Sequence, residues 1–229
     1  MRTLFDRELE EIRTGIRELG NQASRAVAKA VEALIARNLE DARAVKREDV
    51  SSDKLRYDVE NLCLTVIATQ QPVARDLREL TGATFVAVEL ERCGDYAKGV
   101  AKAARRIIRT QSSVASFNLR DMTEHALDML DRSVETFIHH DSTAARAIIG
   151  LDDVVDNYYN ELLAQVTVDM GSDPAHIEGG IWLLHAGHCL ERIGDRATNI
   201  AERVIFLETG SFTGDLNVNK AVDARPIKS

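Results

Sequence analysis

The segment HCLERIGDRATNIAE at residues 188–202 has a counterpart one hundred positions earlier, VELERCGDYAKGVAK at residues 88–102. Aligned, the two segments share Leu, Glu, Arg, Gly, Asp and two Ala in the same places. Each segment stands in the last part of one half of the chain, so it marks an internal repeat. The fold is therefore expected to consist of two copies of one unit.

The repeat extends beyond these two segments. Residues 136–147, TFIHHDSTAARA, align without a gap with residues 33–44, ALIARNLEDARA. In that register Asp152 falls on Asp49 and Asp156 falls on Asp53. A second acidic pair with i, i+4 spacing thus recurs in both halves, and in each half it precedes the repeated motif.

Composition and apolar spacing both predict helices. The chain has only 13 Gly and 3 Pro and 5% aromatic residues, and Ala, Leu, Glu and Arg abound, which favours an all-helical protein. Apolar residues three and four positions apart, with Pro72 and Pro174 as breaks, predict six helices. We place them at about 3–38, 40–70 and 73–109, and then at 118–139, from there to about 171, and at 175–208.

These helices predict an all-α fold of two tandem three-helix bundles related by an internal pseudo-repeat. The first repeat is placed at residues 1–111 and the second at 116–209, because SSVAS at 112–116 is the best polar hinge. Thr209-Gly210 is expected to cap the last helix. Residues 210–229 lack periodicity and are expected to form a flexible C-terminal tail.

Charge and cysteine content limit the classes of function. A formal charge of -8 and a pI near 5.3 argue against nucleic acid as a partner. The isolated Cys63, Cys93 and Cys189 suit a reducing cytoplasm, where small buried thiols are the default. The start of the chain is acidic where a signal peptide is apolar, and no apolar run can span a bilayer. We therefore expect membrane contact only through partners.

The repeated motif places two carboxylates one helical turn apart, as Glu91/Asp95 and as Glu191/Asp195. Like charges at this spacing cost a few tenths of a kcal/mol, so a cation should offset them. One explanation is neutralisation by Arg92 and Arg192, which gives a solvated ionic face. The other is a metal ion, which takes several carboxylate oxygens in one shell. The upstream acidic pairs on a neighbouring antiparallel helix would then bring four carboxylates toward one point.

The sixth predicted helix carries a longer polar stripe, with donors three or four residues apart at His188, Glu191, Asp195, Asn199 and Glu202. Its donor set suits Mg, Mn, Ca or iron, and the thiols are too scattered for structural zinc. His188 is either a ligand or a hydrogen-bond partner of the acids. The first half has Val88, Gly99 and Lys102 at the equivalent positions, so we expect unequal sites with stronger binding in the second half.

The third predicted helix ends in a basic run that includes Arg105, Arg106 and Arg109. Cations near a helix C-terminus complement its dipole, which is the structural explanation. The functional explanation is a docking surface for an acidic partner. Catalysis finds no support, because the chain has no phosphate-binding loop, no matched nucleophile and base, and no Glu-x-x-His. The alternatives to a regulator are a carboxylate-bridged metalloenzyme and a scaffold with solvated ion-pair faces.

Leu-Glu-Arg-x-Gly-Asp occurs twice, QQPVARDLR stands at 70–78 and FLETG stands at 206–210. With these motifs, the chain resembles the PhoU family of phosphate-transport accessory regulators over residues 1–216. The resemblance implies two three-helix bundles with surface clusters of divalent or trivalent metal ions: Fe, Mn, Mg or Zn. Asp76 and Arg78 are expected as a helix N-terminal acid and its ion-pair partner. The ligands it implies are Glu91, Asp95, Asp49 and Asp53 in one half and Glu191, Asp195, Asn199, Glu202, Asp152 and Asp156 in the other.

The same resemblance implies a function. The expected role is negative control of phosphate uptake and of the phosphate-starvation response. The protein would link the ATPase subunit of the high-affinity phosphate transporter to a sensor histidine kinase. It would be cytoplasmic, peripheral to the inner face of the membrane through these partners. A homodimer is also expected, in which the basic face of the third helix meets an acidic face of a second copy.

Overall fold

The computed structural model describes residues 2–48, 50–110 and 118–211, and every regular element within them is helical. The first half contains α1 (Arg2–Ile35), α2 (Leu39–Glu48), α3 (Val50–Gln70) and α4 (Ala74–Thr110). The second half contains α5 (Leu119–His139), α6 (Ser142–Ile149), α7 (Asp152–Ser172), the 3-10 turn η1 (Pro174–His176) and α8 (Ile177–Thr209).

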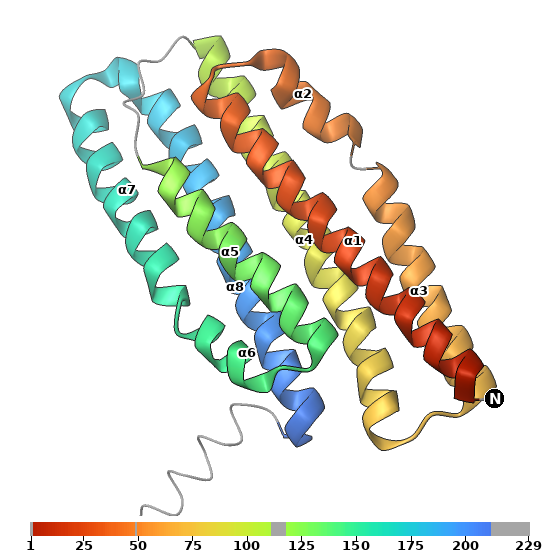
Figure 1. Ribbon diagram of the computed structural model, residues 1–229. Helices are drawn as coiled ribbons and strands as arrows, with labels where there is room; N and C mark the ends of the chain where they lie inside the picture. The colour runs from red at the N-terminus through yellow and green to blue at the C-terminus, as the bar shows by residue number, and fades with distance from the viewer. Residues whose placement is uncertain (1, 49, 111–117, 212–229) are drawn as a thin grey trace, which may run out of the picture.

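Each half is a three-helix unit whose second member in sequence consists of two helices, α2 and α3 in the first half and α6 and α7 in the second. Figure 1 shows α1 and α4 running in one direction, and α5 and α8 running in the opposite direction beside them. Contacts between α1 and α5 and between α4 and α8 join the units. The predicted all-α architecture of two tandem bundles is therefore confirmed.

The second helix of each unit is predicted as a single helix, and in the second unit that helix is broken. In the first unit α2 ends at Glu48 and α3 begins at Val50, and residue 49 lies outside the described residues. In the second unit the helix stops at Ile149 and resumes at Asp152, and the N–H of Leu151 donates to the carbonyl of Ile148 at 2.9 Å. Gly150 lies at this corner, where its low helix propensity favours the break.

The core follows the apolar stripes, and α4 and α8 occupy its centre. The buried residues of α4 extend from Glu79 to Ile107, and many of them are Ala or Gly. Small residues let the two central helices approach closely. A Cβ atom built on Gly99 would lie 2.7 Å from the Sγ of Cys189. The free thiols of Cys63, Cys93 and Cys189 are buried in this core, as the sequence predicts.

The C-terminal end of α8 is capped in two ways. Gly210 has a φ of 73°, and its N–H donates to the carbonyl of Phe206 at 2.8 Å, which confirms the predicted cap. Arg78 donates its Nε–H to the carbonyl of Leu207 at 3.0 Å. In the described part of the chain no ion pair joins Arg78 to Asp76, so that expected pair is wrong. The competing partner is an unpaired carbonyl at a helix end.

Two predicted features lie outside the described residues, namely the boundary between the repeats at 111–117 and the tail from residue 212. In the part of the chain that is described, no helix is both long enough and apolar enough to cross a lipid bilayer.

Candidate metal-binding faces

The second unit brings three of the predicted ligands together where the first turn of α7 meets α8. Burial raises the pKa of Asp152, and the negative charges of Asp156 and Asp195 raise it further. The hydroxyl of Thr198 donates to Asp152 at 3.2 Å and offsets part of this shift. These three carboxylates therefore share one patch of the surface and repel one another.

The other acid of the second motif belongs to an ionic chain along α8. The Nδ1 of His188 lies 2.9 Å from a carboxylate oxygen of Glu191. Arg192 lies 2.7 Å from Asp195 and 3.5 Å from Glu191. Arg192 therefore neutralises the acidic pair, as one of the two explanations predicts. The Glu191 oxygen that faces His188 is buried and has no hydrogen-bond partner among the described residues.

Asn199 and Glu202 continue along α8 with different surroundings. The amide of Asn199 donates to the carboxylate of Glu89 on α4 at 3.0 Å, so its side chain faces the boundary between the units. This places Asn199 away from the three clustered carboxylates. Glu202 is half-buried one turn further along α8.

The first unit brings together Glu91, Asp95 and Asp53. Burial raises the pKa of Glu91, and Asp95 and Asp53 raise it further, against the opposing charges of Arg56 and Lys98. The Nζ of Lys98 lies 2.5 Å from Asp95. Asp49, the fourth predicted ligand of this half, lies outside the described residues.

The expected neutralisation by Arg92 is not the arrangement in this half. Arg92 instead donates to Glu89 at 2.8 Å, because that carboxylate is buried and has a stronger need for a cation. Lys98 takes the place at the acidic pair that Arg92 was expected to fill.

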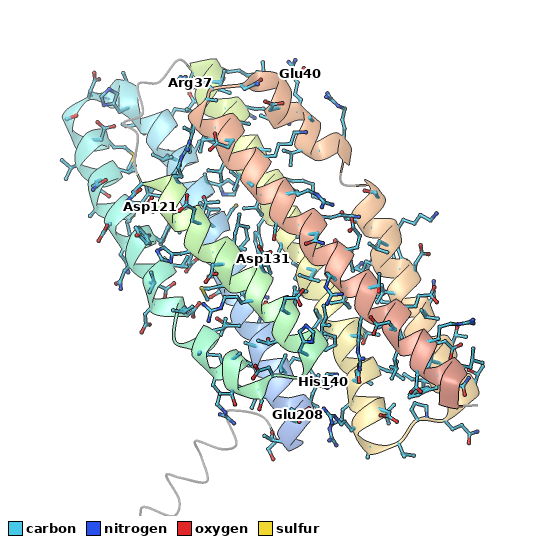
Figure 2. All side chains as sticks on the ribbon, in the orientation of Figure 1. Arg37, Glu40, Asp121, Asp131, His140 and Glu208 are labelled. Atoms are coloured by element: carbon cyan, nitrogen blue, oxygen red, sulfur yellow. The ribbon has the colours of Figure 1, made fainter. Side chains whose placement is uncertain are left out.

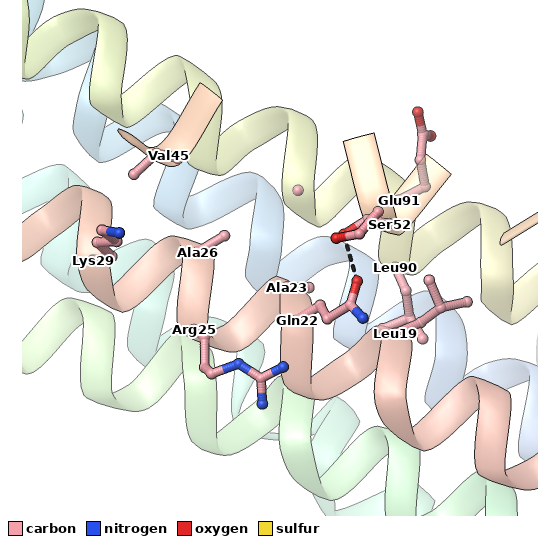
Figure 3. Close-up of a pocket in the computed structure, with 12 residues that line it drawn as sticks. Leu19, Gln22, Ala23, Arg25, Ala26, Lys29, Val45, Ser52, Leu90 and Glu91 are labelled. Carbon is pink, nitrogen blue, oxygen red and sulfur yellow. Dashed lines mark hydrogen bonds between the residues drawn. The ribbon is translucent and has the colours of Figure 1, made fainter. Parts of the chain in front are cut away.

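A hollow of about 420 Å³ opens beside Glu91, between α1, the start of α3 and α4. Ser52 donates to Gln22 across it at 2.8 Å, as Figure 3 shows, and the carboxylate of Glu91 extends away from this pair. Arg25 and Lys29 line the hollow on the α1 side. The first acidic cluster therefore borders a recess that is lined by both polar and apolar residues.

The donor chemistry fits a hard metal ion, because each cluster gathers three carboxylates, and burial and the acidic neighbours raise the pKa of one of them, Glu91 or Asp152. Among the described residues, however, no three His, Cys, Asp or Glu side chains are arranged to hold a metal ion. A bound ion would have to displace Arg192 from Asp195 and Lys98 from Asp95. The ligand sets stay predictions that require this rearrangement.

Glu89 is a site residue that the sequence analysis missed. Its side chain is 2% exposed and accepts hydrogen bonds from Arg92, Arg196 and Asn199 at 2.8, 3.1 and 3.0 Å. Its spacing in the sequence could have predicted that Glu89 is buried. Glu89 lies three residues after Val86 and four before Cys93, within the apolar stripe of α4.

A second missed group joins α1 and the beginning of α4 to the C-terminal ends of α5 and α8. The Nε2 of His140 lies 3.2 Å from Glu79, and Arg13 lies 2.7 Å from the same carboxylate. Glu208 lies 3.5 Å from the other ring nitrogen, and Figure 2 shows His140 and Glu208 at one end of the bundle. Burial alone would raise the pKa of Glu79, but the hydrogen bonds and charges of His140 and Arg13 lower it.

The three arginines predicted to bind a partner lie together near the end of α4. They line a hollow of about 360 Å³ between α2 and α4. Lysines complete its wall.

Comparison with known proteins identifies the repeat unit. The family model of the PhoU domain matches this chain twice, at residues 16–104 and 119–204. The chain belongs to the PhoU family.

Relatives and solved structures agree with this placement. The phosphate-specific transport system accessory protein PhoU homolog of Rhizobium meliloti is 34% identical, over 90% of this chain and 88% of the relative. The homolog of Burkholderia sp is 30% identical, over 90% and 89%. The crystal structure of PhoU from Pseudomonas aeruginosa superimposes with a TM-score of 0.85 at 30% identity and covers 90% of this chain and all of that one.

PhoU-family membership confirms the resemblance seen in the motifs and the tandem fold. The relatives are named as accessory and regulatory proteins of phosphate transport, a non-enzymatic family. The chain is therefore a phosphate-transport accessory protein by family, and the metalloenzyme alternative falls away.

Proposed function

We propose that this PhoU-family protein is a metal-binding negative regulator of phosphate uptake and of the phosphate-starvation response. It would act in the cytoplasm and link the ATPase subunit of the phosphate transporter to a sensor histidine kinase, reaching the membrane only through these partners. The observation that carries the proposal is the match of the PhoU domain to both repeats, beside relatives named for phosphate transport.

Exposed apolar side chains support an adaptor with two docking surfaces. One group lies where α3 turns into α4 and includes Val73 and Leu77, which are 73% and 38% exposed. The other lies where α7 leads into α8 and includes Val168 and Ile181, which are 75% and 55% exposed. These turns are at opposite ends of the molecule (Figure 1). Contiguous exposed apolar surface typically marks protein contacts.

Co-purification tests the two partners separately. The wild type is expected to retain the transporter ATPase subunit and the cytoplasmic part of the kinase. Val73→Asp/Leu77→Asp and Val168→Asp/Ile181→Asp are expected to weaken different partners, while Thr143→Asp, at an exposed position of α6, serves as a control. Binding of neither partner by the wild type at high protein concentration would refute the proposal.

Elemental analysis tests the metal. Untagged wild type is loaded in turn with iron, manganese, magnesium and zinc, beside Glu191→Ala/Asp195→Ala and the matched Glu91→Ala/Asp95→Ala. We expect bound metal that falls further in the second-half variant, because that half has the fuller donor stripe. Metal-free wild type after loading would leave the acidic clusters as ion-pair surfaces.

Self-association is part of the proposal. A homodimer is expected, with a mass in light scattering close to twice that of the 25.4 kDa chain. A monomer mass over a wide range of protein concentration would contradict it.

A further inference from the structure

Six cationic side chains converge on the hollow between α2 and α4. The lining residues are Lys46, Lys98, Lys102, Arg105, Arg106 and Arg109, with Ala42 and Ala101. Among the described residues, α2 supplies one cation and α4 supplies five, and none of those that line the hollow is acidic. In a chain with a net charge of -8, this is a strong local accumulation of positive charge.

Most of these cations lack a carboxylate to neutralise them. Lys98 is paired with Asp95, whereas Lys102 and Arg106 lie over the ring of Trp182 at 5.5 and 5.4 Å. Lys46, Arg105 and Arg109 have no ion pair within the described part of the chain. The Nε of Arg105 is buried without a hydrogen-bond partner among these residues. A buried donor in this state favours an acceptor from outside the chain.

The helix dipole does not account for this charge. Its effect on charged side chains is confined to about the last turn, and only Arg109 lies in the last turn of α4. The second repeat supplies an internal comparison, because α8 has no basic residue in its last turn. The residues there that correspond to Lys46, Arg105, Arg106 and Arg109 are Ile149, Ile205, Phe206 and Thr209. The repeat unit therefore folds without cations at this junction.

The chemistry of the lining selects the ligand. Guanidinium forks match the oxygens of tetrahedral oxyanions, and lysines add mobile positive charge. The described part of the lining has no aromatic ring, side-chain amide or carboxylate, so it has no stacking surface for a nucleobase and no side-chain acceptor for a sugar hydroxyl. Its volume of about 360 Å³ admits a compact ligand. We propose that this basic hollow binds a compact phosphate anion with two or more negative charges.

Two sources supply this chemistry, free orthophosphate and a short condensed phosphate such as pyrophosphate or tripolyphosphate. The number of converging cations predicts that affinity rises with the charge of the anion. Because the hollow lies between α2 and α4, a bound anion would bridge the two helices and raise the melting temperature of the protein by mass action. The hollow adjoins the first acidic cluster, because Lys98 lines it and pairs with Asp95.

Calorimetric titration of the full chain tests the proposal, with orthophosphate, pyrophosphate and tripolyphosphate compared at constant ionic strength. Tripolyphosphate is expected to bind at least about tenfold more tightly than orthophosphate, and Lys46→Gln/Arg109→Gln is expected to lose at least about tenfold. The side chains of Arg109 on α4 and Lys46 on α2 are both exposed, so the variant should fold. Arg43→Gln/Arg146→Gln removes the same charge from exposed positions outside the hollow and should bind as the wild type does.

Three results would overturn the site. The first is no heat of binding and no thermal shift beyond those of chloride at equal ionic strength. The second is an equal loss of affinity in the two double variants. The third is tighter binding of a poly-glutamate peptide than of tripolyphosphate. The last result would assign the hollow to an acidic protein segment. Tight binding of orthophosphate alone would identify the free ion as the source, and a rise along the series would identify condensed phosphate.

Discussion

The carboxylate of Glu89 on α4 lies 3.1 Å from the guanidinium of Arg196 on α8, across the boundary between the two repeats. The Glu89 side chain is 2% exposed and that of Arg196 is 17% exposed, so this ion pair is nearly dry. Arg92 and Asn199 complete the hydrogen bonds of the same carboxylate. The boundary between the units is thus held by a polar centre within a largely apolar interface.

Glu89→Ala is expected to lower the free energy of unfolding by about 3 to 5 kcal/mol, because it leaves Arg196 buried without its partner. Urea denaturation measures the change. Arg92→Ala is the control, since that side chain is 50% exposed and its loss should cost about 1 kcal/mol or less. Equal losses in the two variants would show that the pair is not a buried one.

The repeat and the helices could be predicted because they depend on local patterns. The motif pair, the apolar spacing and the glycine at residue 210 give the tandem fold, the helix ends and the cap. The break at Gly150 was not predicted, because a single glycine lowers helix propensity but does not by itself end a helix.

The candidate site was predictable in part. Spacing brought Asp152 and Asp195 to one patch in the second unit, where the structure also places them. Spacing did not show that the side chain of Asn199 bonds to Glu89. The packing of α4 against α8 decides which side of the polar stripe on α8 is buried. The role of His140 could not be predicted either. It depends on the left-handed backbone of His140 itself, with a φ of 56°, which directs the ring back to Glu79.

Acid should remove the stabilisation supplied by Glu79. Its pKa is lowered in the folded state, so its ionised form stabilises the fold above the ordinary carboxyl pKa, and this contribution disappears as pH falls through the folded value. Glu79→Gln is expected to cost about 2 kcal/mol at pH 7, and the difference from wild type should shrink as the pH falls below about 4.

Urea denaturation at a series of pH values provides the measurement. Glu135→Gln is the matched control, because Glu135 also has a lowered pKa beside Arg17 but is 48% exposed. Its cost should be about 0.5 kcal/mol. A Glu79→Gln difference that stays constant as the pH falls from about 4 to about 2 would contradict the assignment.

Neutralising one of the clustered acids should stabilise the metal-free protein. Asp156→Asn removes a charge that raises the pKa of Asp152, so the unfolding free energy in EDTA should rise by about 0.5 kcal/mol, and high salt should reduce the gain. Asp128→Asn should have the opposite sign, because Asp128 is paired with Arg132 at 2.9 Å. Thermal unfolding compares the two variants, and a lower melting temperature for Asp156→Asn in EDTA would rule out repulsion in the cluster.

Gly99 occupies the position of Asn199 in the first repeat, and the structure gives it a packing role. Its neighbour across the interface is Cys189, which in turn is the equivalent of Glu89. The polar contact of Asn199 with Glu89 and the close contact of Gly99 with Cys189 are therefore the same pair of positions in the two repeats. The glycine follows from the approach of the helices at this point.

Gly99→Ala would place a Cβ 2.7 Å from the Sγ of Cys189, so we expect a net loss of about 1 kcal/mol, as overpacking exceeds the gain in helix propensity. Adding Cys189→Ala removes the obstructing sulfur and should leave a favourable coupling of about 1 kcal/mol in a double-mutant cycle. Gly171→Ala is the control, since nothing lies within 4 Å of its Cβ, and it should stabilise slightly. If Gly99→Ala stabilises as much as Gly171→Ala, α4 and α8 are further apart than described, and the departure from Asn at this position needs an explanation outside the interface.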